Sequence, residues 1–271
     1  MKKIFFYTAI IAIGFTACQS TKNATSKSKL PSSSLNKEAA VLWQQTSAEY
    51  DALCYQAFNI AKHRIDLAIE RGKDGSQLTI VMDLDETVLD NSPYNGFLIK
   101  NGKEFDKESW NRWVQKASAE LVPGALDFIK YAEAKGATIY YISNRSIENI
   151  NPTVLNLQKH GINVDQQYVL LSEAGKANKD GRRQYVNRIN SFEPVLLIGD
   201  NLADFIGDFE NDMSFIEREK ITKNLERAFG NIFIMLPNTM YGGWEKALKY
   251  NDPLIQESDK GNAIKYLNSF E

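Results

Sequence analysis

Cysteine and histidine are scarce in this sequence, with two of each among 271 residues. If Cys18 is lipidated, Cys54 has no partner, so a disulfide framework is excluded and the apolar core must hold the fold. We interpret Cys54 as a small buried hydrophobic residue in a helix. His63 falls within a predicted helix and His160 precedes Gly161 at a helix end, so neither is a plausible metal ligand.

The sequence also lacks a membrane-spanning apolar run and a strong excess of either charge. Residues 4–15 are apolar, but this run is too short to cross a bilayer as a helix. The formal net charge is -2, so nothing indicates a basic surface for nucleic acid. Hydrophobic residues make up 43% and charged residues 24%, which is typical of a globular protein. The length of 271 residues allows one large domain or two small ones.

The N-terminus has the organisation of an export signal. Two lysines precede the apolar residues 4–15, which fit the hydrophobic region of a secretory signal. Residues 15–18, FTAC, resemble the bacterial lipobox, in which the cysteine is lipidated and becomes the mature N-terminus; phenylalanine replaces the usual leucine. We therefore predict a signal peptide over 1–17 and lipidation at Cys18, with a plain signal peptide and a nearby cysteine as the alternative.

A polar segment follows this signal. Residues 19–36 contain eight Ser or Thr, three Lys and few apolar side chains, so they cannot offset their ordering entropy by burial. We predict a flexible tether over 18–36 and a folded domain over 37–271. Gln19 is compatible with sorting to the outer membrane, so the expected location is the bacterial cell envelope, with a lipid anchor and an undetermined leaflet.

Helical and strand patterns alternate along the folded part. Apolar residues at helical spacing predict one long helix, or two joined helices, over 38–71. Short apolar strands are predicted at 77–82, 137–142, 167–171, 194–198 and 232–235, and helices at 123–134, 152–160 and 180–189. This order predicts an α/β fold with a doubly wound, mostly parallel sheet and an N-terminal helical extension. The aromatic-rich insertion at about 92–121 is interpreted as a small cap.

Two acids follow the first predicted strand. Asp83 and Asp85 stand two residues apart in IVMDLDETVLDNSPY (80–94), so both can project toward one face. Adjacent carboxylates repel and are costly to bury. A solvated loop or a helix cap would explain a single acid there, but that explanation is weak for two acids after an apolar strand.

A second pattern of strand and acids lies at 195–205, VLLIGDNLADF. Asp200 follows the strand, and Asp204 would lie in the first turn of a helix that begins after Asn201. Helix capping by these residues is compatible with function. Ligands bind at the carboxyl ends of parallel strands. The acids of both segments are therefore expected to converge there, and their oxygen atoms suit Mg²⁺.

These two segments resemble the signatures of the class C acid phosphatases, the lipoprotein e type with 5'-nucleotidase activity, in the haloacid dehalogenase superfamily. The resemblance covers the chain from about residue 40 to its end. The Ser or Thr that the superfamily places after a strand matches Ser143 in YYISNR (140–145). Its lysine near a helix start matches Lys179, with Lys176 as the alternative.

The resemblance implies a Mg²⁺-dependent phosphomonoesterase that forms an aspartyl-phosphate. Asp83 would attack phosphorus, and Asp85 would protonate the leaving oxygen and then take a proton from water. The carboxylates of Asp83 and Asp200 and the main-chain carbonyl of Asp85 would hold Mg²⁺. Ser143, Asn144 and Lys179 would stabilise the phosphoryl oxygens. Asp204 and Thr87 would lie next to these groups and support the metal or the lysine.

Aromatic residues of the insertion and of a later loop are candidates for substrate selection. Trp110 and Trp113 are three residues apart, and segment 237–244, PNTMYGGW, adds Tyr241 and Trp244. Flat aromatic faces can stack on a nucleobase, and the family resemblance favours this role for Trp110 and Tyr241. We interpret Trp113 and Trp244 as buried core residues. A nucleoside 5'-monophosphate is then the leading substrate.

Two other interpretations stay open. One is a sugar-phosphate phosphatase or a phosphomutase of the same fold. The other is a non-catalytic surface binding lipoprotein, against which the four intact acids argue. The sequence does not indicate which phosphate ester is preferred or whether the chain forms a homodimer.

Overall fold

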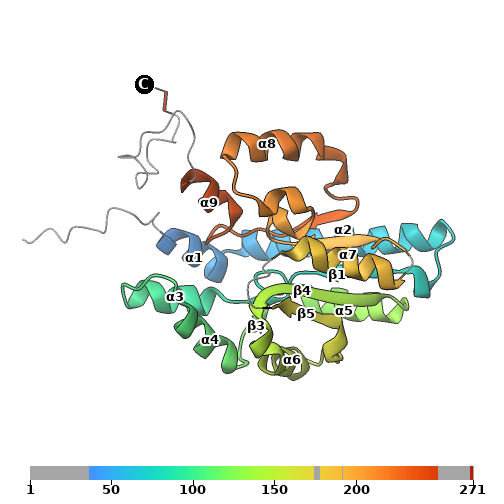
Figure 1. Cartoon of the computed structure of the whole chain (residues 1–271), viewed down its shortest axis with the longest axis horizontal. Coiled ribbons are helices and arrows are strands. Elements are labelled where there is room, and N and C mark those ends of the chain that lie inside the picture. Colours follow the sequence, from blue (N-terminus) through green and yellow to red (C-terminus); the bar gives the residue numbers. More distant parts are fainter. Residues whose placement is uncertain (1–36, 174–177, 191, 250–268, 271) are drawn as a thin grey trace, which may run out of the picture. The chain divides into compact units, whose positions relative to one another are not determined.

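The computed structural model describes residues 37–173, 178–190, 192–249 and 269–270 (Figure 1). The chain divides into units of residues 1–32 and 33–271, and every described residue belongs to the second. The predicted signal peptide, Cys18, the tether and Lys176 lie outside the described residues. Among the described residues, no helix is long and apolar enough to cross a membrane.

A five-stranded parallel sheet forms the centre of the unit. Its strands, in the order β5-β4-β1-β6-β7, are Val169–Ser172, Thr138–Ser146, Thr79–Met82, Leu196–Gly199 and Phe233–Met235. All neighbouring strands pair in parallel. The four residues of β1 are buried, as expected for a central strand that is covered on both faces. The predicted parallel α/β fold is therefore confirmed.

Helices cover both faces of this sheet. Alternating side chains of β1 point to opposite faces: Ile80 and Met82 belong to a core shared with helices α2, α5 and α6. Val81 instead packs in a second cluster with Val186 of α7. These helices span Ala48–Glu70, Ala125–Ala134, Ile150–Lys159 and Lys179–Asn190, respectively (Figure 1). The sheet is therefore doubly wound, as predicted.

The N-terminal extension consists of two joined helices. The helix α1 (Lys37–Thr46) ends where Ser47 caps α2, because the Ser47 hydroxyl accepts a hydrogen bond from the Tyr50 N–H at 3.1 Å. Cys54 lies on α2 and is fully buried without a disulfide. The interpretation of Cys54 as a small core residue is confirmed.

The insertion between β1 and β4 contains its own small elements. These are β2 (Leu89–Asp90), α3 (Ser92–Lys100), α4 (Lys107–Gln115) and β3 (Glu120–Leu121). The strands β2 and β3 pair antiparallel and close the insertion at its base. The segment that we interpret as a cap thus holds two short helices between the paired strands β2 and β3, which form a separate two-stranded sheet.

After β6 the chain forms short 3-10 helices, which precede the last two α-helices of the described residues. The 3-10 helices η4 and η5 span Leu202–Asp204 and Gly207–Glu210. The helices α8 (Phe215–Asn224) and α9 (Gly243–Lys249) pack against each other. They flank β7 in the sequence and form a region separate from the insertion (Figure 1).

Candidate active site

The acids that the sequence singles out lie together at the carboxyl ends of neighbouring strands. Asp83 follows β1, and its N–H donates to the Ile198 carbonyl of β6 at 2.9 Å. Asp200 follows β6 directly, and Ser143 lies in the last part of β4. Because β4 and β6 are the two neighbours of β1, their ends bring these side chains to one edge of the sheet.

Three carboxylates form a compact cluster at this edge. One oxygen each of Asp83, Asp200 and Asp204 lies within 4.8 Å of the others. All three residues are buried. The Lys179 ammonium bridges two of them, with Nζ 2.6 Å from Asp83 Oδ1 and 2.5 Å from Asp204 Oδ1. Lys179 therefore lies where the predicted site lysine is expected, and the alternative Lys176 lies outside the described residues.

The position of Lys179 depends on Glu210, a residue that the sequence analysis did not single out. Lys179 is the first residue of α7. The Glu210 carboxylate accepts hydrogen bonds from the main-chain N–H groups of Lys179 at 3.0 Å and of Asp180 at 2.7 Å. A carboxylate is favourable at a helix N-terminus because it accepts from free N–H groups and complements the helix dipole. No local pattern could reveal this contact, since Glu210 lies 31 residues from Lys179.

Burial and crowding perturb the acids. Burial raises the pKa of Asp83 well above its usual range, although Lys179 acts in the opposite direction. Burial and the neighbouring Asp204 raise the pKa of Asp200 to about 7. Burial alone would lower the pKa of Lys179, but Asp204 and Asp83 outweigh it and hold that pKa above the ordinary value. Lys179 is therefore positively charged, and it balances only part of the cluster's negative charge.

This donor set fits a hard divalent cation. Three ionised carboxylates beside one ammonium group leave two negative charges, which a divalent ion would offset. All of the candidate ligands are oxygen atoms, as Mg²⁺ prefers. The Asn238 amide donates to Asp200 Oδ2 at 2.7 Å, and the Thr87 hydroxyl lies 3.4 Å from Asp200 Oδ1. Thr87 thus lies where it was assigned, whereas Asn238 was missed.

Asp85 lies beside the cluster in a different environment. Its carboxylate accepts from the Ser143 hydroxyl at 2.9 Å, the Asn91 amide at 2.9 Å and the Arg145 guanidinium at 2.8 and 2.9 Å. Burial raises the pKa of Asp85, but Arg145 outweighs that effect and holds it below the usual value. Arg145 was missed, although its position two residues after Ser143 on a strand places both side chains on one face. Ser143 contacts Asp85 through its hydroxyl in this structure.

The Arg182 guanidinium links α7 to the ends of β4 and β5 through hydrogen bonds. Arg182 Nη1 donates to the main-chain oxygens of Ser143 at 2.5 Å and Leu170 at 3.0 Å, and Nη2 donates to Asn144 Oδ1 at 2.7 Å. Asn144 is exposed, so its amide is accessible at the strand end. Arg182 was also missed, because its partners belong to two other strands.

The loop after Asp85 has an unusual backbone. Glu86 has φ 61°, in the left-handed region that non-glycine residues rarely adopt. Its side chain is fully buried, and Oε1 accepts from the Asn91 N–H at 2.8 Å, while Oε2 has no hydrogen-bond partner among the described residues. This contact folds the loop back so that the Asn91 amide reaches Asp85.

Aromatic side chains of the insertion stand next to Asp85. The Trp110 ring packs edge-on against Tyr94, with centroids 5.1 Å apart, and lies 5.8 Å from the Arg145 guanidinium. Phe105 lies 6.4 Å from Trp110 and is 65% exposed, so it offers the most accessible of these rings. Trp113 donates to Asn91 Oδ1 at 2.8 Å, which anchors the insertion rather than leaving this ring for substrate. Phe105 was not assigned from the sequence.

The loop after β7 reaches the same edge of the sheet. Asn238 contacts Asp200, and its Oδ1 accepts from the N–H groups of Met240 at 2.9 Å and Tyr241 at 3.4 Å. These contacts bend the loop so that Tyr241, which is half-buried, follows a residue that touches the acid cluster. The structure therefore brings the Tyr241 loop close to Asp200, and it places the Trp110 ring beside the arginine that pairs with Asp85.

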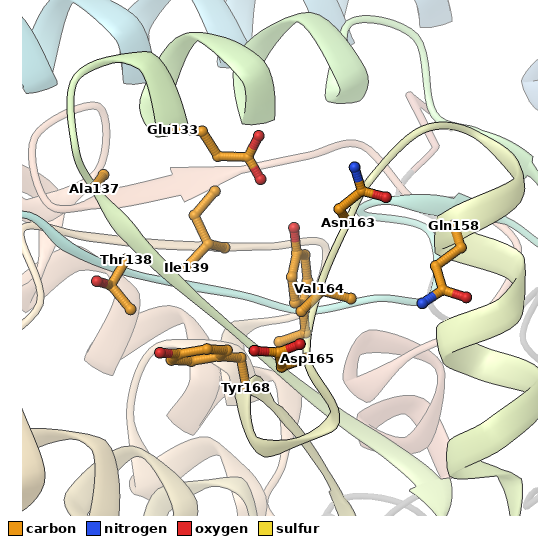
Figure 2. A pocket seen from close by; sticks show the side chains of 10 residues that line it. Glu133, Ala137, Thr138, Ile139, Gln158, Asn163, Val164, Asp165 and Tyr168 are labelled. Atoms are coloured by element: carbon orange, nitrogen blue, oxygen red, sulfur yellow. The ribbon is translucent and has the colours of Figure 1, made fainter.

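Figure 2 shows a hollow at the opposite edge of the sheet. Its volume is about 340 Å³, and it includes Thr138 at the start of β4 and Tyr168 just before β5. These are the amino ends of the strands, whereas the acids follow the carboxyl ends. The hollow is therefore separate from the candidate active site.

Known proteins with similar sequences support this description. Residues 5–244 match the family described as HAD superfamily, subfamily IIIB (Acid phosphatase). Acid phosphatase 1 of Solanum lycopersicum is 26% identical over 62% of this chain and 65% of its own length. A stem 31 kDa glycoprotein of Glycine max is 26% identical over 49% of this chain, and the match spans only 54% of that relative.

Solved structures extend the similarity to the three-dimensional level. The class C acid phosphatase from Bacillus anthracis is 39% identical, with a TM-score of 0.77, over 87% of this chain and 98% of that one. A second structure of the Bacillus anthracis class C acid phosphatase has tungstate bound, and it is 38% identical with a TM-score of 0.76 over the same shares of both chains. Together with the acid cluster at the ends of β1 and β6, these similarities show that the chain belongs to the acid phosphatase subfamily IIIB of the HAD superfamily.

Proposed function

We propose that this protein is a Mg²⁺-dependent phosphomonoesterase in which Asp83 is the nucleophile. The observation that carries this proposal is the buried cluster in which Lys179 bridges Asp83 and Asp204 beside Asp200. A carboxylate that contacts a fixed ammonium group and belongs to a candidate cation site is suited to attack a phosphate ester. The tungstate in the similar Bacillus anthracis structure is a tetrahedral oxyanion, which adds support for an oxyanion site.

The proposal assigns a residue to each chemical step. Asp83 forms a bond to phosphorus while the bond to the leaving alcohol breaks, and Asp85 supplies the proton to that alcohol. Water then attacks phosphorus, Asp85 takes the water proton, and phosphate leaves with Asp83 restored. Lys179 stabilises the phosphoryl charge. Mg²⁺, held by Asp83, Asp200 and the Asp85 carbonyl with Asp204 beside them, would supply positive charge that offsets the repulsion between Asp83 and the phosphate.

The surroundings of Asp85 bear on the pH at which this chemistry runs. The first step requires a protonated Asp85, whereas Arg145 favours the ionised carboxylate. Acidic solution therefore favours the step in which Asp85 acts as an acid. The second step uses the ionised form that Arg145 stabilises.

The proposed substrate class is a nucleoside 5'-monophosphate. Phe105 and Trp110 form an aromatic surface beside Asp85, and Tyr241 follows the loop that contacts Asp200. Flat aromatic faces can stack on a nucleobase while the phosphate lies at the acids. A sugar-phosphate phosphatase or a phosphomutase of this fold would not need that surface.

We also propose that the protein is lipid-anchored at Cys18 in the bacterial cell envelope, with the outer membrane as its location. This proposal is supported by the lipobox-like residues 15–18 and by the polar segment that separates them from the folded domain.

The nucleophile is tested with Asp83→Asn. This change preserves the side-chain size but removes the attacking charge, so we expect kcat/KM with an aryl phosphate and Mg²⁺ to fall by about three orders of magnitude or more. The wild type, stopped with acid during turnover, should carry a phosphoryl group on the peptide that contains Asp83, and the variant should not.

Asp127→Asn is the matched control, because Asp127 lies on α5 with an exposed side chain and pairs with Lys62. It should retain the wild-type activity. Substantial turnover by the folded Asp83→Asn protein would remove Asp83 from the mechanism.

A further inference from the structure

A buried arginine outside the candidate active site has no counter-ion among the described residues. Arg218 on α8 is 8% exposed, yet the described residues provide neither a hydrogen bond nor an ion pair for its guanidinium. The side chain lies over the Phe209 ring, with 5.2 Å from the guanidinium carbon to the ring centroid. Burial lowers the pKa of Arg218, and no acidic neighbour raises it again. The described residues whose polar atoms are fully buried without a partner do not include Arg218, so its guanidinium is accessible from the groove that it lines. An unpaired charge on a largely buried side chain is costly, so its presence requires an explanation.

The other buried arginines, Arg145 and Arg183, both form ion pairs. Arg145 pairs with Asp85 and hydrogen bonds to Thr153. Arg183 contacts Glu210 and donates to the Ala203 carbonyl at 2.8 Å. Arg218 therefore differs from the other buried arginines, because no described residue pairs with its guanidinium.

Arg218 lines a groove between α8 and α9. The groove has a volume of about 750 Å³, within the range of small-molecule sites. Its walls include the apolar residues Leu202, Ala247 and Trp244, and Trp244 is 38% exposed although the sequence favours a buried position. Among the described lining residues, Arg218 and Lys223 contribute positive charge and Glu219 contributes negative charge, which leaves one net positive charge.

A glycine makes room for the guanidinium. A Cβ atom on Gly243, the first residue of α9, would lie 2.7–2.9 Å from three atoms of the Arg218 guanidinium. The bare backbone at this position therefore lets the charged group lie against the start of α9. Any larger residue would force the end of the Arg218 side chain to move.

We propose that this groove is a binding site for a small organic monoanion, namely a carboxylate attached to an aromatic or aliphatic body. The planar guanidinium can hold a carboxylate through two parallel hydrogen bonds, which would supply the missing counter-ion. The apolar walls and the Trp244 ring would cover the body of the ligand. A single net positive charge suits a monoanion. The proposal is independent of the proposed phosphatase activity, because the groove shares no lining residue with the acid cluster.

The test uses the full chain and two probes of the same size, 3-phenylpropionate and the uncharged 3-phenylpropan-1-ol. Calorimetry or ligand-observed NMR should show that the wild type binds the carboxylate, and that Arg218→Met weakens this binding by roughly tenfold or more. Arg227→Met is the matched control, because Arg227 is exposed on a neighbouring 3-10 helix, and it should bind like the wild type. The alcohol should bind more weakly than the carboxylate to the wild type and equally to all three proteins.

Gly243→Ala provides a second variant that keeps the charge. The added methyl group displaces only the flexible end of Arg218, so the melting temperature should change little while carboxylate binding falls. The melting temperature of Arg218→Met should be unchanged or raised, since an unpaired buried charge has been removed. Equal carboxylate binding by wild type and Arg218→Met, or no binding to the wild type at all, would overturn the proposal.

Discussion

At the scale of single residues, the protonation of Asp200 links the acid cluster to its metal. Burial and Asp204 raise its pKa from 3.8 to about 7 when no cation is bound. The folded protein then holds a proton that the unfolded chain releases, so the free energy of unfolding decreases as the pH rises from about 4 to about 7. A bound divalent cation favours the ionised carboxylate and should cancel this loss.

The first prediction follows from this decrease in the free energy of unfolding as the pH rises. The increase in melting temperature caused by saturating Mg²⁺ should grow steadily between about pH 5 and about pH 8, because protons compete with the metal at low pH. Differential scanning fluorimetry with Mg²⁺ or with a chelator measures it. Asp200→Asn should lose most of the pH dependence, whereas melting curves that shift equally at every pH would contradict the assignment.

A second prediction at this scale concerns Arg145. Its guanidinium lowers the pKa of Asp85, so Arg145→Gln should raise that pKa and keep Asp85 protonated to higher pH. The alkaline decline of kcat should then move upward by roughly one pH unit or more if the acid step limits turnover. Arg145→Lys retains the charge and should shift the profile less. An unmoved profile in both variants would separate Arg145 from the protonation of Asp85.

At the scale of elements, the insertion and β4 act as one unit around Asp85. Arg145 and Ser143 approach Asp85 from β4, while Asn91 approaches from the base of the insertion and is itself held by Trp113. Trp110 supports Arg145 from α4. Replacing Trp110 would therefore disturb the acid as well as the proposed stacking surface. Phe105 is the cleaner position at which to test substrate recognition.

Phe105→Ala should impair the hydrolysis of nucleotides selectively. Loss of one stacking ring removes about 1–3 kcal/mol, so kcat/KM for a nucleoside monophosphate should fall roughly tenfold to a hundredfold. A small aliphatic phosphate has no ring to stack, so its kcat/KM should be unchanged. Phe97→Ala is the matched control, since this exposed ring packs on Tyr94 in the same insertion. Equal losses on both substrates would indicate damaged packing rather than lost recognition.

At the scale of the whole molecule, the predicted anchor and the folded domain should be separable. Cys18→Ala prevents acylation without touching any residue from 37 onward, so the variant should leave the membrane fraction and retain the wild-type kcat/KM. Cell fractionation and mass spectrometry of the wild-type N-terminus measure this outcome. An unacylated wild type, or a variant that stays membrane-bound, would contradict the lipoprotein proposal.

The element pattern was predictable because it depends on local periodicity. The strand predicted at 194–198 is observed at Leu196–Gly199, and that predicted at 232–235 is observed at Phe233–Met235. The strand predicted at 137–142 continues to Ser146, because its register shifts after Ile142 and pairing with β5 resumes at Ser172. Such a bulge depends on the partner strand, so the sequence of β4 alone does not reveal it.

The sequence alone determined the chemical character of the site, since apolar strands that end in acids must place those acids at one edge of a parallel sheet. The tertiary structure decided which charges meet. Lys179 is 96 residues from Asp83, and Arg145 is 60 residues from Asp85. Pairings at such separations depend on how helices and loops pack around the sheet. The same packing leaves Arg218 buried without an ion pair to any described residue, although its own helix contains the two acids Glu217 and Glu219. Burial and geometry, rather than proximity in the sequence, select the partners of each charge.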